Sequence, residues 1–396
     1  MSKKYLFTSE SVTEGHPDKV CDAISDSILD TLLKQDPSSR VACETLVSRG
    51  LVVVTGEITT NGYAEVEHIV KDTLKEIGYT SNESGMHNEE AKILTFIHPQ
   101  SNEISQGVDD YDGHEQGAGD QGLMFGYACT ETKELMPMPI QIAHRLTEKL
   151  AEVRKNGTLP WLKPDGKSQV SIRYEDEKPV AIEQVVIAAQ HKDMLEEFGD
   201  VKTELSFVNK EIIEHVIEPV LKKFNLPYQN SHIVNGTGRF VEGGPAADAG
   251  LTGRKIIVDT YGGYAPHGGG AFSGKDPSKV DRSGAYMARY IAKNVVAPGF
   301  AEKCEVQFSY GIGVAEPTSF YVRTFGTGTI PDEKLTKICS EVFPLKPGYI
   351  IEHLKLKAPR YLQTSAYGHF GREDDNFTWE KVDMVDELKS AVDERN

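Results

Sequence analysis

The fold class is decided near the N-terminus, by the stretch Val41-Ala-Cys-Glu-Thr-Leu-Val47, Ser48-Arg49-Gly50, Leu51-Val-Val-Val-Thr-Gly-Glu-Ile-Thr59. Its two runs of β-branched and apolar residues predict two strands, and Arg49-Gly50 predicts a hairpin turn between them. A hairpin joins antiparallel strands, whereas a doubly wound sheet joins parallel strands through helical crossovers. Strand and helix patterns also follow one another in irregular order along the rest of the chain. The sequence therefore predicts an α+β fold.

The hairpin carries two glutamates. Alternation places Glu44 on one face with Ala42 and Leu46, and counting from the turn places Glu57 opposite Glu44 to within one residue of register. Two carboxylates side by side on a sheet face repel each other. Either both are solvated, or a cation lies between them.

A helix is predicted directly before the hairpin. Apolar residues recur every four positions, the spacing of one helix face, at Val20, Ile24, Ile28 and Leu32. Pro17 suits the first helical position, because its missing N–H has no intrahelical partner there, and Pro37 ends the pattern. This start places His16 at the N-cap and Asp18 in the first turn.

Further patterns predict the remaining elements. Helices are expected over residues 63–77, 210–221, 277–296 and 384–392, and strands over 170–174, 180–188 and 256–260. Polar and glycine-rich compositions predict irregular segments over 99–120 and 154–167.

Composition narrows the class of protein. A chain of 396 residues suggests two or three domains. Its net charge of −17 argues against a general nucleic-acid binder, and no apolar run approaches the roughly 18 residues that span a bilayer. The five cysteines are odd in number and widely spaced, which predicts buried free thiols rather than disulfides or a zinc site. The N-terminus does not resemble a signal peptide, so a cytoplasmic location is expected.

One glycine motif matches the residues of a dinucleotide-binding pattern but lacks the strand and helix that the pattern requires on either side. The run from Gly117 to Gly122, GAGDQG, fits G-x-G-x-x-G. That motif requires a buried strand before it and a long helix after it, but polar residues precede it and Pro137 and Pro139 follow soon after. We expect the glycines to allow close approach of the backbone instead.

A second glycine-rich run predicts an anion site. The stretch from Gly269 to Asp276, GGAFSGKD, nearly matches a phosphate-binding P-loop, but Asp276 replaces the Mg²⁺-binding hydroxyl. Glycine-rich backbone leading into a helix still offers N–H groups to an anion, and Lys275 adds a charge. Asp276 suits the N-cap of that helix and Pro277 its first position. Residues 239–293 carry eight basic and five acidic side chains, which suggests a polyanionic ligand; a flexible glycine hinge is the alternative.

Several motifs together resemble the S-adenosylmethionine synthetase (methionine adenosyltransferase) family. They cover nearly the whole chain and comprise GHPDK from Gly15, GAGDQGLMFGY from Gly117, DGKSQV from Asp165, GTGRF from Gly236, GRK from Gly253 and GGGAFSGKD from Gly268. The last run is the most specific of them.

The resemblance implies three similar subdomains of mixed sheet plus helices around a pseudo-threefold axis, over residues 4–102, 116–238 and 239–380. It implies a reaction that joins ATP and L-methionine into S-adenosylmethionine and then hydrolyses the bound triphosphate to phosphate and pyrophosphate. It also implies a homodimer with active sites at the subunit interface, often a homotetramer, with two Mg²⁺ per site and one K⁺ per subunit. Neither nucleic acid nor a membrane is an expected partner.

The resemblance also assigns roles to residues. The catalytic set is His16, Lys167, Arg254 and Lys275. The ATP-binding set is His16, Asp165, Lys167, Arg239, Phe240, Asp248, Arg254, Lys255, Ala271 and Lys275, and the methionine-binding set is Glu57, Gln100, Asp120, Asp248 and Lys279. Mg²⁺ is assigned to Asp18 and Asp281 and K⁺ to Glu44, so the two hairpin glutamates serve neighbouring ligands rather than one shared cation.

Two departures from the family pattern fall in the expected lid. Pro99 stands where a flexible residue is expected, and Glu103 stands where Asp is expected. A proline fixes one backbone angle, so the departures bear on lid motion rather than on chemistry. Two rival functions are a methionine-independent ATPase and an ATP-binding regulatory module; a protein-interaction scaffold would leave the clustered cations unexplained.

Overall fold

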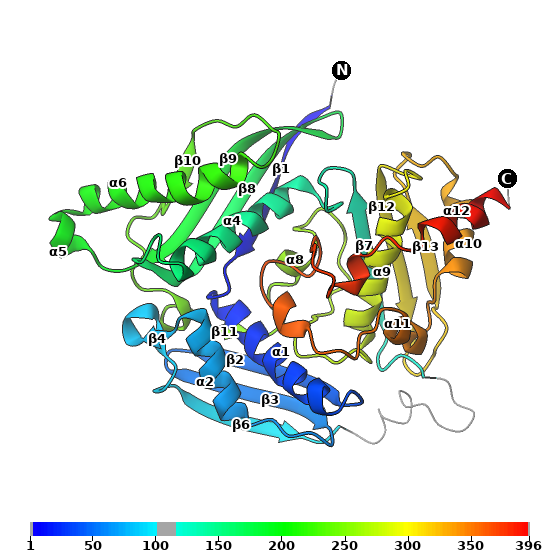
Figure 1. Ribbon diagram of the computed structural model, residues 1–396, viewed down its shortest axis with the longest axis horizontal. Coiled ribbons are helices and arrows are strands. Elements are labelled where there is room, and N and C mark those ends of the chain that lie inside the picture. The colour runs from blue at the N-terminus through cyan, green and yellow to red at the C-terminus, as the bar shows by residue number, and fades with distance from the viewer. Residues whose placement is uncertain (1–2, 101–115, 395–396) are drawn as a thin grey trace.

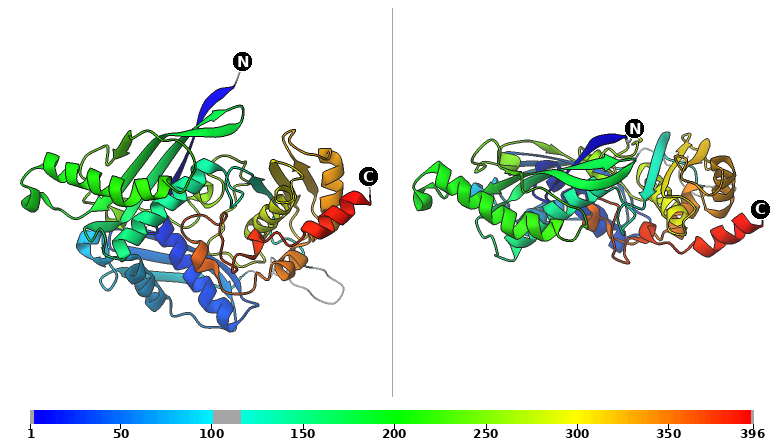
Figure 2. Two further views of the ribbon diagram at one scale, coloured as in Figure 1. Left: turned by 45° about the horizontal axis from the view of Figure 1, so that its top comes forward. Right: turned by 90° about the horizontal axis from the view of Figure 1, so that it is seen from above.

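The computed structural model describes residues 3–100 and 116–394. Figure 1 shows three sheet-and-helix units arranged around a common centre, and the edge-on view in Figure 2 shows that the molecule is flattened. The prediction of an α+β fold is confirmed by three sheets of three or four strands together with their helices.

The first unit contains the predicted hairpin. Its sheet has the order β11-β2-β3-β6, in which β6 runs parallel to β3. The bounds are β2 Arg40–Ser48, β3 Leu51–Thr59, β6 Lys92–His98, β11 Gly250–Leu251, α1 Pro17–Gln35 and α2 Val66–Ile77, with the small pair β4 Thr80–Ser81 and β5 Met86–His87. Helix α1 begins at Pro17 with His16 as N-cap, and α2 ends at Gly78 in the left-handed region, as the sequence predicts.

The second unit has the sheet order β1-β8-β9-β10. Its bounds are β1 Lys4–Val12, β8 Leu162–Glu175, β9 Lys178–His191, β10 His232–Val234, α4 Met138–Lys155, α5 Leu195–Phe198, α6 Val201–Ile212 and α7 Glu218–Leu221. A π-helical turn, Ile213–Ile217, joins α6 to α7.

The third unit has an antiparallel sheet of order β13-β12-β7. Its bounds are β7 Gly122–Cys129, β12 Lys303–Tyr310, β13 Ser319–Arg323, α9 Val280–Val296, α10 Asp332–Val342, α11 Pro347–His353 and α12 Val385–Asp393. The short helix α8 Ile256–Asp259 lies near the centre of the molecule, between the units (Figure 1).

The three units exchange strands in a cycle. Strand β1 pairs with β8 over nine residues, β7 pairs with β12 over eight, and β11 adds to β2. Each of the ranges 4–102, 116–238 and 239–380 therefore contributes one strand to the sheet of another range. This exchange interlocks the units.

Four local predictions are wrong in their details. Residues 256–259 form helix α8 rather than a strand, and the buried Asp259 carboxylate lies 2.5 Å from Lys19 Nζ. Strand β8 already begins at Leu162, because it pairs there with the end of β9. The predicted helix from Lys210 belongs to a helical run that starts at Val201. Helix α9 begins at Val280 with Lys279 as N-cap.

The late start of α9 has a local cause. The Asp276 carboxylate accepts a hydrogen bond from the Ser278 amide at 2.9 Å, which makes a turn before the helix rather than a cap of it. The sequence run after Gly117 is also not a dinucleotide-binding turn, because it leads into strand β7 instead of a helix. All five cysteines are buried and free, as expected.

Candidate active site

The N-terminus of α1 places His16 and Asp18 side by side. His16 Nδ1 accepts the Asp18 amide at 3.2 Å, and both side chains are buried. Burial, and then the charge of Lys255, lower the pKa of His16 to about 3, although Asp18 opposes them. The imidazole is therefore neutral near pH 7, and because Nδ1 accepts, its proton lies on Nε2.

Asp18 holds two groups from a distant segment. Its Oδ1 accepts the Leu251 amide at 3.0 Å, and Oδ2 forms an ion pair with Lys255 Nζ. Lys167, on the exposed side of β8, lies close enough to depress the pKa of His16 as well. Four of the predicted residues therefore form one group, which we call group A: His16, Asp18, Lys167 and Lys255.

Helix α1 carries a row of carboxylates four residues apart, which bind backbone N–H groups of later segments as Asp18 does. Each accepts at least one backbone N–H from beyond residue 250, and the bonds are Asp18 with Leu251 at 3.0 Å, Asp22 with Gly253 at 2.8 Å, Asp26 with Gly274 at 2.8 Å and Asp30 with Tyr361 at 3.0 Å. Residues four apart lie on one face of a helix. One face of α1 thus positions the segments that carry Arg254, Lys255 and Lys275.

The glycine-rich run is pinned against strand β2. Gly274 has φ +78°, and a Cβ there would lie 1.9 Å from the Cys43 carbonyl oxygen. The Cys43 amide also donates to the Gly274 carbonyl at 2.9 Å. Lys275 Nζ then lies 2.8 Å from Asp281 Oδ2, and a Cβ at Gly270 would overlap the same carboxylate. Only glycine permits both close approaches.

The two hairpin glutamates share a face but are not directly opposite. Glu44 pairs with Thr55 and Glu57 with Ala42, so the expected register is wrong by two residues. Partial desolvation and then Glu57 raise the pKa of Glu44, while Lys275 and Lys279 lower it. This proximity defines a second group, group B: Glu44, Glu57, Lys275, Lys279 and Asp281.

Asp165 lies in β8, two residues from Lys167. Its Oδ2 accepts the Gly244 amide at 2.9 Å, whereas the buried Oδ1 has no partner among the described residues. Burial raises the pKa of Asp165 to about 6, with Lys167 opposing and the exposed Asp248 adding to the shift. A buried carboxylate oxygen without a donor is costly, which makes Oδ1 a candidate acceptor for a ligand.

Arg239 and Phe240 are held by residues that the sequence analysis missed. Arg239 Nε lies 2.6 Å from the buried Glu204 Oε2, and its guanidinium also pairs with the exposed Asp193. The Phe240 amide donates to His191 Nε2 at 3.2 Å. Neither Glu204 nor His191 stands in a recognisable motif, and their roles depend on contacts across the fold.

The remaining predicted residues are scattered around these groups. Arg254 is exposed and has no ion pair among residues 3–100 and 116–394, and Asp120 is exposed at a turn before β7. Ala271 lies against Gly253, where an added Cβ would be 2.3 Å away. The Gln100 amide donates to Thr59 Oγ1 at 3.0 Å. Pro99 is exposed, and Glu103 lies outside the described residues.

Groups A and B lie on the same side of α1 but do not meet. Group A surrounds Asp18, whereas the glycine run of group B docks on Asp26, eight residues further along. At about 1.5 Å per residue, the two docking points are about 12 Å apart. Among the contacts of the described residues, none joins a side chain of group A to one of group B.

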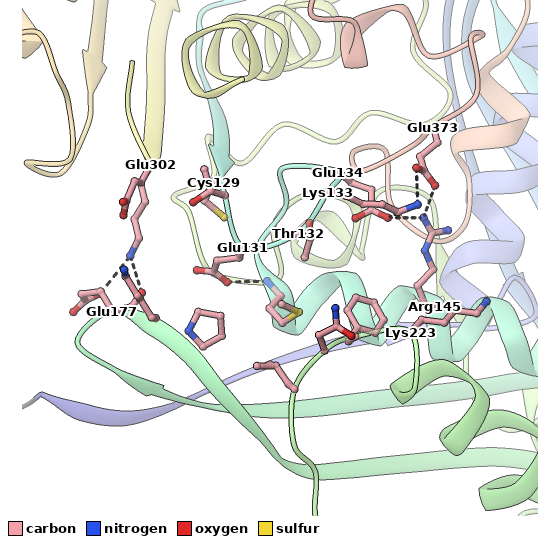
Figure 3. Close-up of a pocket in the computed structure, with 18 of the residues that line it drawn as sticks. Cys129, Glu131, Thr132, Lys133, Glu134, Arg145, Glu177, Lys223, Glu302 and Glu373 are labelled. Atoms are coloured by element: carbon pink, nitrogen blue, oxygen red, sulfur yellow. Dashed lines mark hydrogen bonds and ion pairs between the residues drawn. The ribbon is translucent and has the colours of Figure 1, made fainter. Parts of the chain in front are cut away.

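A wide cleft lies elsewhere and contains none of the predicted residues. It measures about 1140 Å³, and its lining comes from the 129–138 segment, the β8–β9 turn and the 223–226 loop. Figure 3 shows Lys133 and Arg145 next to Glu134 and Glu373, with 2.8 Å between Lys133 Nζ and Glu373 Oε1. Arg145 also pairs with Glu148 at 2.9 Å. Lys133 and Arg145 are therefore already neutralised, and no residue of groups A or B lines the cleft.

No described helix has the length and apolarity required to cross a membrane.

Comparison with known proteins identifies the family. The chain matches the S-adenosylmethionine synthetase N-terminal domain over residues 4–102, the central domain over 115–240 and the C-terminal domain over 242–381. It is 55% identical over 393 residues to the S-adenosylmethionine synthase of Sulfurovum sp. (strain NBC37-1), covering 99% of this chain and 100% of that protein. It is 56% identical over 391 residues to the synthase of Maridesulfovibrio salexigens, with 98% of each chain covered. The match to the synthase of Clostridium tetani is 54% over 396 residues, covering 98% of this chain and 99% of that protein. The chain therefore belongs to the S-adenosylmethionine synthetase family.

Proposed function

We propose that this enzyme joins ATP and L-methionine to form S-adenosylmethionine and then hydrolyses the triphosphate to phosphate and pyrophosphate. The methionine sulfur attacks the ribose 5′ carbon, the new S–C bond forms, and the C–O bond breaks with its electron pair on the triphosphate. The sulfur carries no proton, so this step needs no general base. It needs in-line positioning and cations that stabilise the leaving group.

The observation that carries this proposal is the composition of groups A and B. Each group sets a lysine against an aspartate, Lys255 with Asp18 and Lys275 with Asp281. Lysines beside carboxylates suit a polyphosphate bound together with a metal ion. The neutral His16 adds an Nε2–H donor for the departing oxygen.

The other proposed ATP contacts lie around group A. Lys167 and Arg254 are exposed cations available to phosphate oxygens. Asp165 Oδ1 is the free acceptor for a polar group of the nucleotide. We assign Phe240 to the adenine ring, and Arg239, Asp248 and Ala271 to its surroundings.

The proposed methionine site uses group B. Glu57 suits the substrate ammonium, and Lys279 suits its carboxylate. Asp120, Asp248 and Gln100 complete the set.

The residues fit the family's ions by donor type. Carboxylate oxygens are the ligands that Mg²⁺ prefers, and Asp18 and Asp281 supply them beside the phosphate-binding lysines. When bound, two Mg²⁺ would neutralise charge on the triphosphate. Glu44 is assigned to K⁺, because partial burial and then the neighbouring Glu57 raise its pKa, and a cation would stabilise its charged form.

We further propose a homodimer in which group A of one subunit meets group B of its partner, assembled into a homotetramer. Each sheet exposes apolar side chains on its outer face, among them Leu6 on β1, Phe96 on β6 and Leu123 on β7. On β6 these alternate with Ile93 and Ile97, which pack against the core. Three apolar sheet faces are a surface that a second copy would cover. We also propose a cytoplasmic location and three subdomains, over residues 4–102, 116–238 and 239–380.

A product assay tests the function. The protein is incubated with ATP and Mg²⁺, with and without L-methionine and K⁺, and the products are separated. Methionine-dependent S-adenosylmethionine, with phosphate and pyrophosphate in equal amounts, is the expected result. ADP formed whether or not methionine is present would overturn the proposal in favour of an ordinary ATPase.

A further inference from the structure

Glu204 is a buried carboxylate that no step of the proposed reaction uses. It lies in the first turn of α6, and its side chain is fully buried. Its Oε2 lies 2.6 Å from Arg239 Nε, and its Oε1 accepts the Met194 amide at 3.0 Å and an Arg239 nitrogen at 3.3 Å. A buried carboxylate with this many donors is held in one geometry, so it fixes the guanidinium that it binds.

His191, at the end of β9, holds Phe240, the residue that follows Arg239. Its Nδ1 lies 2.8 Å from the Lys192 carbonyl oxygen, so Nδ1 donates and Nε2 accepts. That Nε2 accepts the Phe240 amide at 3.2 Å, while the His191 amide donates to the Phe240 carbonyl at 2.9 Å. Both backbone polar groups of Phe240 are thus bound by one residue.

Glu204 and His191 also lie close to each other. His191 Nδ1 lies 3.8 Å from Glu204 Oε1, and the Trp161 ring packs edge-on against the His191 ring at 6.5 Å between centroids. The aromatic ring of Phe240 in turn leaves no space for a Cβ at Gly243, which would lie 2.8 Å from Cε2. The backbone and the ring of Phe240 are therefore both constrained.

We propose that Glu204 and His191 are positioning residues that hold the Arg239–Phe240 segment in place for the adenine ring of ATP. The inference rests on the proposed function, which gives Phe240 its contact with adenine. It assigns a role in nucleotide affinity to one residue of α6 and one of β9, both of which lie outside the recognisable motifs. Among the described residues, neither side chain bonds a member of group A or group B, so both should act on ATP binding alone.

The Arg239 ion pairs offer a matched pair of variants. Glu204 and Asp193 both bind the same guanidinium, but the Glu204 side chain is fully buried and that of Asp193 is 59% exposed. Glu204→Gln keeps an oxygen for the Met194 amide and removes the charge. Asp193→Asn makes the same chemical change in solvent, where an ion pair contributes little.

Steady-state kinetics with the full-length protein test the inference. We expect Glu204→Gln and His191→Phe to raise KM for ATP by about tenfold, with kcat and KM for methionine changed by less than about twofold. Asp193→Asn should match the wild type. Hydrolysis of added inorganic triphosphate, which lacks adenine, should stay within about twofold of wild type in all three variants.

The kinetic results distinguish the positioning role from general damage to the fold and from failure of the proposed function. An unchanged KM for ATP in folded Glu204→Gln and His191→Phe would overturn the inference, as would an equal loss of synthesis and triphosphate hydrolysis, which indicates general damage to the fold. If Glu204→Gln does not fold, His191→Phe carries the test, because it removes two neutral hydrogen bonds and no charge. Wild-type protein that forms no S-adenosylmethionine would instead overturn the proposed function, and the adenine role would fall with it.

Discussion

Lys275 and Asp281 form an ion pair with 2.8 Å between Nζ and Oδ2, and Lys255 and Asp18 repeat this pairing at the N-terminus of α1. In each pair a proposed phosphate-binding lysine neutralises a proposed Mg²⁺-binding aspartate. When a metal–polyphosphate complex binds, each lysine would leave its aspartate and pair with phosphate, and each aspartate would bind the metal ion. Neither charge would have to be buried alone, which avoids the large cost of an unpaired charge.

Replacement of Lys275 tests this pairing. We expect Lys275→Ala to lower kcat on the order of 100-fold, because it removes a cation that stabilises the leaving triphosphate. The fold should persist, since the pair is partly exposed and such pairs contribute little to stability. Product assays and thermal unfolding measure the two effects.

Lys71→Ala is the matched control. Lys71 forms an ion pair of the same 2.8 Å length with Glu67, and its side chain is 26% exposed against 22% for Lys275. Its loss should leave the rate at the wild-type level. A near-wild-type rate in folded Lys275→Ala would contradict the role of Lys275.

Gly274→Ala should displace the glycine-rich run. A Cβ at this position would lie 1.9 Å from the Cys43 carbonyl oxygen, and φ is +78°. Gly269→Ala has the same backbone problem at φ +94°, but nothing lies within 4 Å of its Cβ. We expect Gly269→Ala to cost about 1 kcal/mol of stability and to remain active, and Gly274→Ala to lose most of its activity. Equal activity in the two variants would show that contact with β2 does not position Lys275.

The carboxylate row of α1 predicts unequal stability losses. Asp26 binds the Arg282 guanidinium through both oxygens, at 2.8 and 3.0 Å, and both side chains are buried. Asp26→Asn should lower the free energy of unfolding by about 3–5 kcal/mol, because it leaves a buried cation without its partner. Within the described part of the chain, Asp30 accepts two backbone amides and no side-chain donor, so Asp30→Asn should cost about 1 kcal/mol. Urea denaturation measures both, and similar losses would show that Arg282 finds another partner.

Buried histidine should make the protein sensitive to acid. Burial, with help from Arg372, lowers the pKa of His144 well below its usual range. The unfolded chain binds a proton at about pH 6.5, so the contribution of neutral His144 is present above that pH and is lost as the pH falls below it. We expect His144→Gln to lose less stability than wild type between pH 7 and pH 5, by up to about 1.4 kcal/mol per pH unit. His68→Gln, an exposed site on α2, controls for the substitution, and parallel pH profiles of His144→Gln and wild type would exclude the effect.

Local patterns predicted the elements whose interactions are themselves local. Helix α1 and the β2–β3 hairpin follow from apolar spacing, Pro17 and the Arg49-Gly50 turn, and they lie where the sequence placed them. Residues 256–260 are predicted as a strand because Ile256, Ile257 and Val258 are apolar and β-branched. The structure makes them a helix, and its buried Asp259 pairs with Lys19, 240 residues away in sequence.

In the site too, features marked by local motifs were predicted, and features that depend on long-range contacts were not. The motifs assigned Asp18 and Asp281 to Mg²⁺ and the two lysines, Lys255 and Lys275, to ATP. The regular spacing of Asp18, Asp22 and Asp26 indicated nothing without its partners. Their amide donors lie beyond residue 250. Glu204 was invisible for the same reason, because a single glutamate in a helical pattern is usually solvated.

The proposed sharing of sites between subunits can be tested by mixing two inactive variants. Asp18→Asn inactivates group A and Lys275→Ala inactivates group B. If each site joins group A of one subunit to group B of the other, a mixed dimer holds one intact site and one doubly altered site. Random mixing should then restore about one quarter of the wild-type sites.

The two homodimers are purified, inactive when assayed separately, and then mixed under conditions that exchange subunits. Recovery of activity near that fraction, with the mixed dimer isolated through a tag on one variant, is the expected result. As a control, wild type mixed with Lys275→Ala should keep one active site in each mixed dimer. If a single chain supplied both groups to one site, the mixture of Asp18→Asn and Lys275→Ala would stay inactive, because every chain would carry a defective site.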